Sequence, residues 1–132
     1  MGAADFLLGV CESWMTPALF LSVTFIAGAV ISFFTGSSWG TFAICIPIAV
    51  PMAYSFTGGQ LGTLVYAAVG AVVSGGLFGD HCSPVSDTSV LSSLGAACDH
   101  IDHVRTQLPY ALLAAAVSII LWIVVALVGG AA

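Results

Sequence analysis

A polar stretch at residues 79–90 (GDHCSPVSDTSV) follows a long apolar run and combines side chains that could bind a cation and exchange a proton. It contains the carboxylates of Asp80 and Asp87 and the hydroxyl groups of Ser83, Ser86, Thr88 and Ser89. Small hard cations prefer oxygen ligands, and a carboxylate that holds either a cation or a proton is the simplest competitive exchanger. We therefore interpret this stretch as a cation and proton site, with Asp80 and Asp87 as its charged groups and sodium as its natural cation.

A second polar stretch, residues 35–41 (TGSSWGT), has the same character. Its hydroxyl groups include those of Ser37, Ser38 and Thr41. These oxygens could also bind a cation, but the same residues would suit an ordinary extramembrane turn with Trp39 at the membrane interface. Both interpretations are open from the residues alone.

The composition of the chain indicates the environment of the two stretches. The 132 residues are 60% hydrophobic and only 5% charged, with a mean hydropathy of +1.15. A soluble domain needs about a quarter of charged residues to cover its surface. We therefore predict a single all-α integral membrane domain over residues 1–132, multi-pass in the cell membrane and in contact with the lipid bilayer. Arg105 is the only lysine or arginine, which excludes the basic surface that nucleic-acid binding requires.

Apolar segments that could form membrane helices lie on both sides of each polar stretch. A spanning helix needs about 20 apolar residues. Residues 17–56 are predicted to form a helical hairpin with the first polar stretch at its tip, and residues 61–98 a helix that the second stretch interrupts. Residues 108–128 are the clearest full span, with Pro109 in the first turn, where its missing N–H does no harm. Residues 99–107 are predicted to be a solvated loop, and their one basic residue places the loop in the cytoplasm.

A helix that is interrupted at membrane depth indicates a functional site. An unpaired backbone N–H or C=O that faces lipid costs several kcal/mol, so non-helical backbone survives only inside the protein or beside a watery cavity. The ends of the half-helices carry partial charges, and freed carbonyls add oxygen ligands. An ionised carboxylate there costs roughly 3 kcal/mol or more unless a cation compensates for it. We therefore expect the two breaks to approach each other near the middle of the apolar region.

Two alternatives give the polar residues other roles. Ser86 and Asp87 could simply cap the short helix that follows the second break. The sequence GSSWG at residues 36–40 matches the G-x-S-x-G pattern of serine hydrolases, with Ser38 as nucleophile and His81 and Asp80 as its partners. That pattern requires a strand-to-helix turn, and the flanking segments here are apolar helices instead.

Two further alternatives concern the chain as a whole. A metal site could gather from His81, Cys82, Cys98, His100 and His103. Their spacing matches no zinc-binding pattern. The chain could also be a structural membrane subunit with no site at all.

The stretches TGSSWGTF and GDHCSPVSDTSVLSSLGAACDHIDHVRTQLPYAL together resemble the NhaC-type sodium/proton antiporter family, within the wider ion-transporter superfamily. The resemblance covers roughly residues 25–127. It implies one repeat of an inverted-repeat transporter, made of a re-entrant helical hairpin, a broken transmembrane helix and a final transmembrane helix. It also implies sodium/proton antiport and ion-binding roles for both polar stretches. The implied ion-binding residues are Ser37, Ser38, Thr41, Asp80, Ser83, Asp87 and Thr88, with the sodium ion at Asp80, Asp87 and Ser38.

The chain is shorter than members of that family, which have a second repeat and a scaffold. It resembles the C-terminal transport half of such a protein, as a fragment or a split subunit. Its expected partners are the missing N-terminal half or a second subunit, and further copies of itself. Relatives of the family are associated with organic anions, so a sodium-coupled malate or lactate exchanger is the alternative function. No cofactor is expected, because sodium ions and protons are the transported species.

Overall fold

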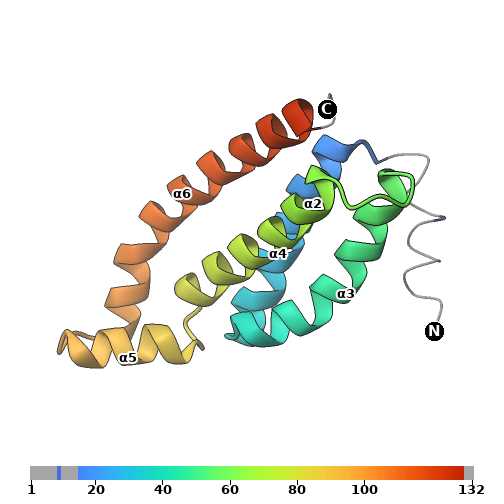
Figure 1. The fold of residues 1–132 in the computed structure, drawn as a ribbon. Helices are drawn as coiled ribbons and strands as arrows, with labels where there is room; N and C mark the ends of the chain where they lie inside the picture. Colours follow the sequence, from blue (N-terminus) through green and yellow to red (C-terminus); the bar gives the residue numbers. More distant parts are fainter. Residues whose placement is uncertain (1–8, 10–14, 130–132) are drawn as a thin grey trace.

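The computed structural model describes residues 9 and 15–129, and all of the regular structure within them is helical (Figure 1). The helices are α2 (Pro17–Thr35), α3 (Ser38–Phe56), α4 (Thr63–Cys82), α5 (Asp87–Gly95) and α6 (His100–Gly129). Within this part of the chain, four helices (α2, α3, α4 and α6) are long and apolar enough to cross a membrane. The predicted all-α membrane fold is therefore confirmed. The ends of the predicted domain, residues 1–8, 10–14 and 130–132, lie outside the described residues.

The lengths of the helices fit the thickness of a bilayer. Helices α2 and α3 have 19 residues each and α4 has 20, which gives each a length of about 30 Å. Helix α5 has only 9 residues, so it is a half-length helix after the second break. Helix α6 has 30 residues and is longer than the hydrocarbon core requires.

Helix α6 begins at His100, whereas the sequence predicts its start at residue 108 and a solvated loop over residues 99–107. The side chain of Asp99 explains the difference. Its Oδ1 atom accepts two backbone N–H groups of the first turn of α6, at 2.9 and 3.2 Å. These donors have no partner within a helix, so a side-chain acceptor at this point allows the helix to start. Pro109 therefore lies inside α6 rather than in its first turn.

Both predicted interruptions are present, but each is shorter than its polar stretch. The first consists of Gly36 and Ser37, and the second of residues 83–86. Asp80 consequently belongs to the last turn of α4, and Asp87 is the first residue of α5. Most of the polar side chains thus lie at helix ends, where backbone groups without helical partners are also found.

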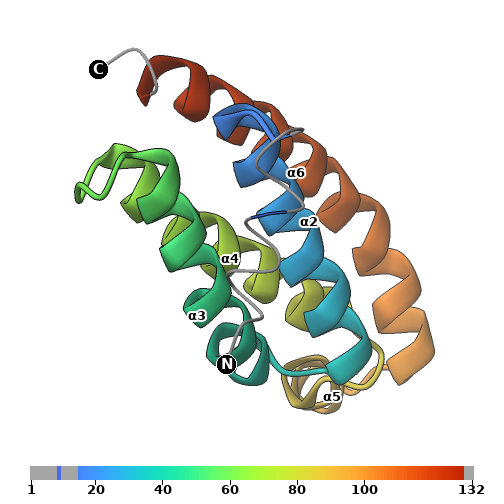
Figure 2. The same ribbon diagram turned by 90° about the vertical axis from the view of Figure 1, so that its right-hand side faces the viewer.

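The direction of the helices brings the two breaks together. Figures 1 and 2 show α2 and α4 running side by side towards α5, whereas α3 and α6 lead away from it. Helix α5 lies across this end of the long helices in both views. The two breaks therefore meet, as predicted, but at one end of α2, α3 and α4 rather than midway along them.

Helices α2 and α4 approach each other closely where α4 carries glycine. A Cβ atom at Gly79 would lie only 2.7 Å from the backbone nitrogen of Phe33 in α2. Three residues before Gly79 along α4, the Ser32 hydroxyl of α2 donates to the carbonyl of Gly76 at 2.6 Å. Small residues that admit a neighbouring backbone are a common basis of helix packing in membranes. The contact fixes the end of α4 beside the end of α2, and with it the position of Asp80.

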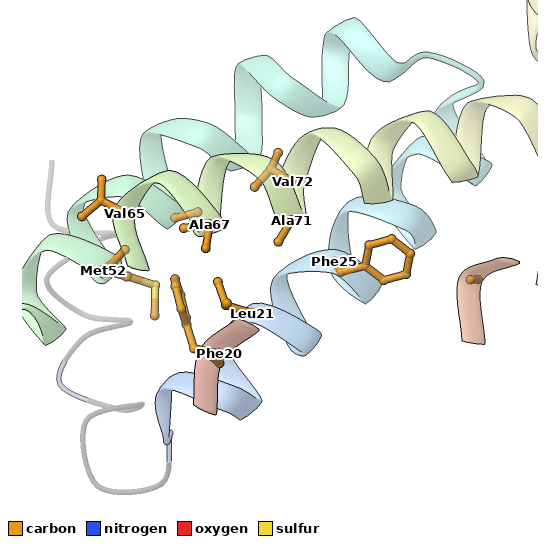
Figure 3. Packing of buried hydrophobic residues seen from close by; sticks show 13 residues of the cluster. Phe20, Leu21, Phe25, Met52, Val65, Ala67, Ala71 and Val72 are labelled. Carbon is orange, nitrogen blue, oxygen red and sulfur yellow. The ribbon is translucent and has the colours of Figure 1, made fainter. Parts of the chain in front are cut away.

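Away from the breaks, the helices are held together by apolar side chains. Phe20 and Leu21 of α2 pack against Met52 of α3 and Ala67 of α4 in one buried cluster (Figure 3). The rings of Phe20 and Phe56 also meet, with their centroids 5.5 Å apart. The bundle is therefore apolar near the start of α2 and polar at the end where the breaks meet.

Candidate functional site

The carboxylate of Asp80 joins the second break to the first. Asp80 is only 7% exposed, in the last turn of α4. Its Oδ2 atom accepts the hydroxyl of Ser38 at 2.8 Å and the backbone N–H of the same residue at 3.3 Å. Ser38 is the first residue of α3. These two charge-assisted hydrogen bonds from Ser38 fix the positions of the two breaks relative to each other.

The other carboxylate oxygen of Asp80 is bound from α5. The hydroxyl of Ser86, the N-cap residue of α5, donates to Oδ1. The Ser86 oxygen also accepts the backbone N–H of Thr88 at 3.2 Å and lies 2.7 Å from the Thr88 hydroxyl. Because Ser86 has one hydroxyl proton and directs it to Asp80, Thr88 is the donor in this last contact. The result is a connected polar network of Ser38, Asp80, Ser86 and Thr88.

Two helix N-termini point at this network. The first residue of α3 donates its backbone N–H to Asp80, and the N-cap of α5 donates its hydroxyl. Helix N-termini carry partial positive charge, so both favour a negative carboxylate at this position. The C-terminal ends of α2 and α4 also lie here: a Cβ atom at Gly36 would be 2.9 Å from the carbonyl oxygen of Val85. Gly36 has a φ of +67°, a conformation that glycine adopts without strain.

Three predicted ligands make local contacts outside this network. Ser37 is the N-cap of α3, and its hydroxyl oxygen accepts a backbone N–H at 3.4 Å. The buried hydroxyl of Thr41 donates to the carbonyl of Ser37 at 3.0 Å. The buried hydroxyl of Ser83 accepts the backbone N–H of Val85 at 3.2 Å. These three side chains build the two breaks, while Ser38 and Thr88 join the carboxylate network.

Asp87 lies apart from the network. It is exposed at the first position of α5, and among the described residues its carboxylate has no hydrogen bond. The cap of α5 is Ser86 rather than Asp87, so the structural role proposed for Asp87 belongs to its neighbour. The sequence indicated the Ser86 hydroxyl as part of the polar stretch but not its direct contact with Asp80. A serine just before a predicted helix start was the available signal.

The rival arrangements of the same residues are absent from the part of the chain that the structure describes. His81 is exposed and lines a cavity on the side of α6, and Ser38 bonds directly to Asp80 instead. Within residues 9 and 15–129, no group of three or more His, Cys, Asp or Glu side chains is positioned to hold a metal ion. His100, one of the candidate metal ligands, has its Nε2 atom 2.7 Å from the carbonyl oxygen of Pro84.

A cavity of about 460 Å³ lies between α4 and α6. Its polar lining consists of Ser74, His81, Gln107, Tyr110 and Ser118. The Oε1 atom of Gln107 is buried and has no hydrogen-bond partner among the described residues. A buried acceptor without a partner is costly, and the residue that carries it is among those lining this cavity.

Four apolar helices long enough to cross a membrane, with a buried carboxylate held between two helix breaks, define an integral membrane protein with a polar site at one end of its bundle. The chain belongs to the Na+/H+ antiporter family, whose model matches residues 1–127. This family consists of transporters, and the chain is accordingly a multi-pass protein of the cell membrane.

Three relatives illustrate the family. An uncharacterized protein of Haemophilus influenzae is 52% identical over 110 residues, which are 83% of this chain and 20% of the relative. The malate-2H(+)/Na(+)-lactate antiporter of Bacillus subtilis is 36% identical over 86% of this chain and 23% of its own length. The Na(+)/H(+) antiporter NhaC of Alkalihalophilus pseudofirmus is 32% identical over 94% of this chain and 26% of its own length. No solved structure matches the chain.

The matched region is a minor part of each relative. The chain spans between 20% and 26% of the length of the curated relatives that it matches.

Proposed function

We propose that this chain carries a sodium and proton exchange site of a sodium/proton antiporter, with Asp80 as the group that binds either ion. The observation that carries the proposal is the position of Asp80, buried between the N-terminal ends of α3 and α5. A buried carboxylate in a membrane protein is expensive and is by default a functional group. Membership of the antiporter family supports the same function.

Sodium would bind to the oxygens of the network. The carboxylate supplies the charge, and the hydroxyl oxygens of Ser38 and Ser86 lie within hydrogen-bonding distance of it. A hydroxyl group is a donor and an acceptor, so each can turn its proton away and offer a lone pair to the cation. Thr88 adds a further oxygen next to Ser86. The site thus offers one charge and several neutral oxygens, which suits a monovalent cation.

A proton would bind to the same carboxylate and exclude sodium. Protonated Asp80 is neutral, so it loses its attraction for the cation and for the two helix N-termini. One of its oxygens then becomes a donor, and the Ser38 or Ser86 hydroxyl can accept from it. Because a single carboxylate serves both ions, binding of one requires release of the other. Repeated on the two sides of a membrane, this competition is antiport.

Asp87 has a secondary role in this proposal. It is exposed at the same helix end and carries a negative charge. An exposed carboxylate near the site can attract sodium without binding it in the buried position. The ion-binding roles of Ser37, Thr41 and Ser83 remain predictions, and that of Asp87 is tested by the Asp87→Asn variant described below.

The second candidate function is exchange of an organic anion coupled to sodium. One relative is named as a malate-2H(+)/Na(+)-lactate antiporter. The cavity between α4 and α6 supports the idea, because His81 and Gln107 line it with polar groups. The lone arginine lies outside this lining, so the carboxylate of a substrate would find little positive charge there. We favour the ion exchanger for this reason.

We also propose that transport requires further chain. Relatives are about four to five times longer than the segment that matches them, as the shares of 20% to 26% imply. The exposed apolar faces of α6 would contact lipid, the remaining helices of the transporter, or a second copy of the chain. Experiments on function therefore use the complete transporter that contains this sequence.

The decisive experiment measures sodium-driven proton flux in membrane vesicles for Asp80→Asn. Asparagine keeps the shape of the side chain but neither carries the charge nor accepts the proton. We expect flux to fall to the level of vesicles without the transporter. Asp102→Asn is the matched control, because Asp102 is exposed in α6 and should leave flux unchanged. Wild-type flux in Asp80→Asn, with normal protein in the membrane, would reject the proposed site.

A further inference from the structure

The second break is attached to the start of α6 through one histidine. The Nε2 atom of His100 lies 2.7 Å from the carbonyl oxygen of Pro84, which is in the middle of the break. A carbonyl oxygen can only accept, so Nε2 carries the proton in this contact. Sixteen residues separate the two partners along the chain.

The second ring nitrogen of His100 fixes the orientation of the ring. Nδ1 lies 3.2 Å from the hydroxyl oxygen of Ser93, a buried residue of α5. Nδ1 can only accept in this tautomer, so the one hydroxyl proton of Ser93 is shared between Nδ1 and the carbonyl oxygen of Val90, which lies 2.8 Å from the hydroxyl oxygen. The imidazole is therefore held between α5 and the break, with one nitrogen bound to each.

His100 binds the carbonyl oxygen of Pro84, which accepts no backbone N–H among the described residues. Ser83 donates its N–H to the carbonyl of Asp80, and Ser86 donates its N–H to the carbonyl of Ser83. Pro84 has no N–H to donate. Its carbonyl, held by His100, lies within the turn that the second of these contacts closes, two residues before the Ser86 hydroxyl that binds Asp80.

We infer that His100 is a positioning residue for the ion site, acting through Pro84 on the orientation of Ser86 towards Asp80. The inference rests on the proposed function, because it concerns the affinity of that site. It assigns the start of α6 a part in the site, although no α6 side chain reaches Asp80 among the contacts of the described residues. Loss of the donor to Pro84 frees the break, and the Ser86 oxygen is then less well placed for sodium.

Two amide variants separate this role from a general structural one. In His100→Gln the amide nitrogen occupies about the place of Nε2 and can donate to Pro84. In His100→Asn the shorter amide occupies about the place of Nδ1 and can reach Ser93 but not Pro84. Both replacements are neutral and similar in polarity, so they differ mainly in reach. His103→Asn is the control, since His103 lies one turn further along α6 and makes no side-chain hydrogen bond among the described residues.

The measurement is the KM for sodium and the maximal rate of sodium-driven proton flux in vesicles with the complete transporter. We expect His100→Asn to raise the KM for sodium roughly fivefold, the usual consequence of losing one hydrogen bond, with little change in maximal rate. His100→Gln and His103→Asn should stay within about twofold of the wild type.

Two results would overturn the inference while leaving the proposed function intact. One is a wild-type KM in His100→Asn when Asp80→Asn has no flux. The other is an equal rise of KM in His100→Gln and His100→Asn, which would mean that contact with Pro84 is irrelevant. If Asp80→Asn itself retains flux, the proposed function is rejected, and the role of His100 is rejected with it because it depends on that function.

Discussion

The Oδ2 atom of Asp80 lies 2.8 Å from the hydroxyl oxygen of Ser38, although the two residues are 42 positions apart in the chain. One belongs to the end of α4 and the other to the start of α3. Through this contact, two helix breaks that would otherwise be separate turns become a single polar site.

Replacing Ser38 by alanine should weaken sodium binding. Alanine keeps the backbone N–H that bonds to Asp80 but removes the hydroxyl, which is both a donor to the carboxylate and a proposed sodium ligand. Hydrogen bonds to charged groups contribute about 1.5–3 kcal/mol, so the KM for sodium should rise about tenfold or more. Ser92→Ala is the control, because the Ser92 hydroxyl is exposed and bonds to its own helix. An unchanged KM in Ser38→Ala would remove Ser38 from the site.

Neutralising Asp87 should have a smaller effect than neutralising Asp80. Asp87 is exposed at the N-terminus of α5, where a negative charge contributes about 0.3–1 kcal/mol. We expect Asp87→Asn to retain sodium-driven proton flux with a modestly raised KM, whereas Asp80→Asn abolishes the flux. Flux assays on the two variants side by side check this. Loss of all flux in Asp87→Asn would show instead that both carboxylates are needed.

Substitution of Gly79 by alanine should destabilise the bundle. The added methyl group would clash with the backbone of α2, including the nitrogen of Phe33 at 2.7 Å. Overpacking of this kind typically costs about 1–3 kcal/mol, so the thermal midpoint in detergent should fall. Gly95→Ala is the matched control, because a Cβ atom at Gly95 has no neighbour within 4 Å. Equal midpoints for the two variants would contradict the close contact of α2 and α4.

Gly36 and Gly58 provide a pair that isolates the contact between the two breaks. Their φ angles are +67° and +64°, so an alanine at either position costs a similar backbone conformational energy of about 1–2 kcal/mol. Only at Gly36 would the new Cβ atom press on the other break, 2.9 Å from the carbonyl oxygen of Val85. We expect both variants to lose some stability but only Gly36→Ala to raise the KM for sodium. A raised KM in both, or in neither, would contradict this.

The competition between ions predicts how the sodium dependence varies with pH. Protons and sodium ions compete for one site in the proposed function, so a lower pH should raise the apparent KM for sodium and change the maximal rate at saturating sodium little. Initial rates of flux over a grid of sodium concentrations and pH values measure both quantities. A KM that does not vary with pH would mean that the two ions bind at separate groups.

Much of this arrangement follows from the sequence, because helix length and polarity leave few choices. Apolar runs of about 20 residues have to be helices in a bilayer, and glycine and serine clusters between them have to be breaks. The separation of Asp87 from the network of Asp80 could not be predicted in this way. A spacing of seven residues puts two side chains on one face of a continuous helix. The break at residues 83–86 places Asp80 and Asp87 in two separate helices instead, so this spacing no longer determines their relative directions.

The start of α6 at His100 could not be predicted from the sequence for a different reason. The run of Asp and His residues before residue 108 resembles a solvated loop in composition, since charged groups usually mark the end of a membrane segment. The capping oxygen of Asp99 makes the same residues the first turns of a helix. The composition of residues 99–107 indicates that they lie near water, but the cap at Asp99 makes them helical.

The glycine contact of α2 with α4 has a mechanical consequence for transport. Where backbone meets backbone, no side chain can change rotamer to accommodate sliding, and the Ser32 bond to the Gly76 carbonyl further resists it. These two helices should therefore move as one rigid body whenever the protein changes conformation. If Asp80 exchanges ions as proposed, the hinges that give access to it would then lie in the two short breaks, where the chain leaves α2 for α3 and α4 for α5.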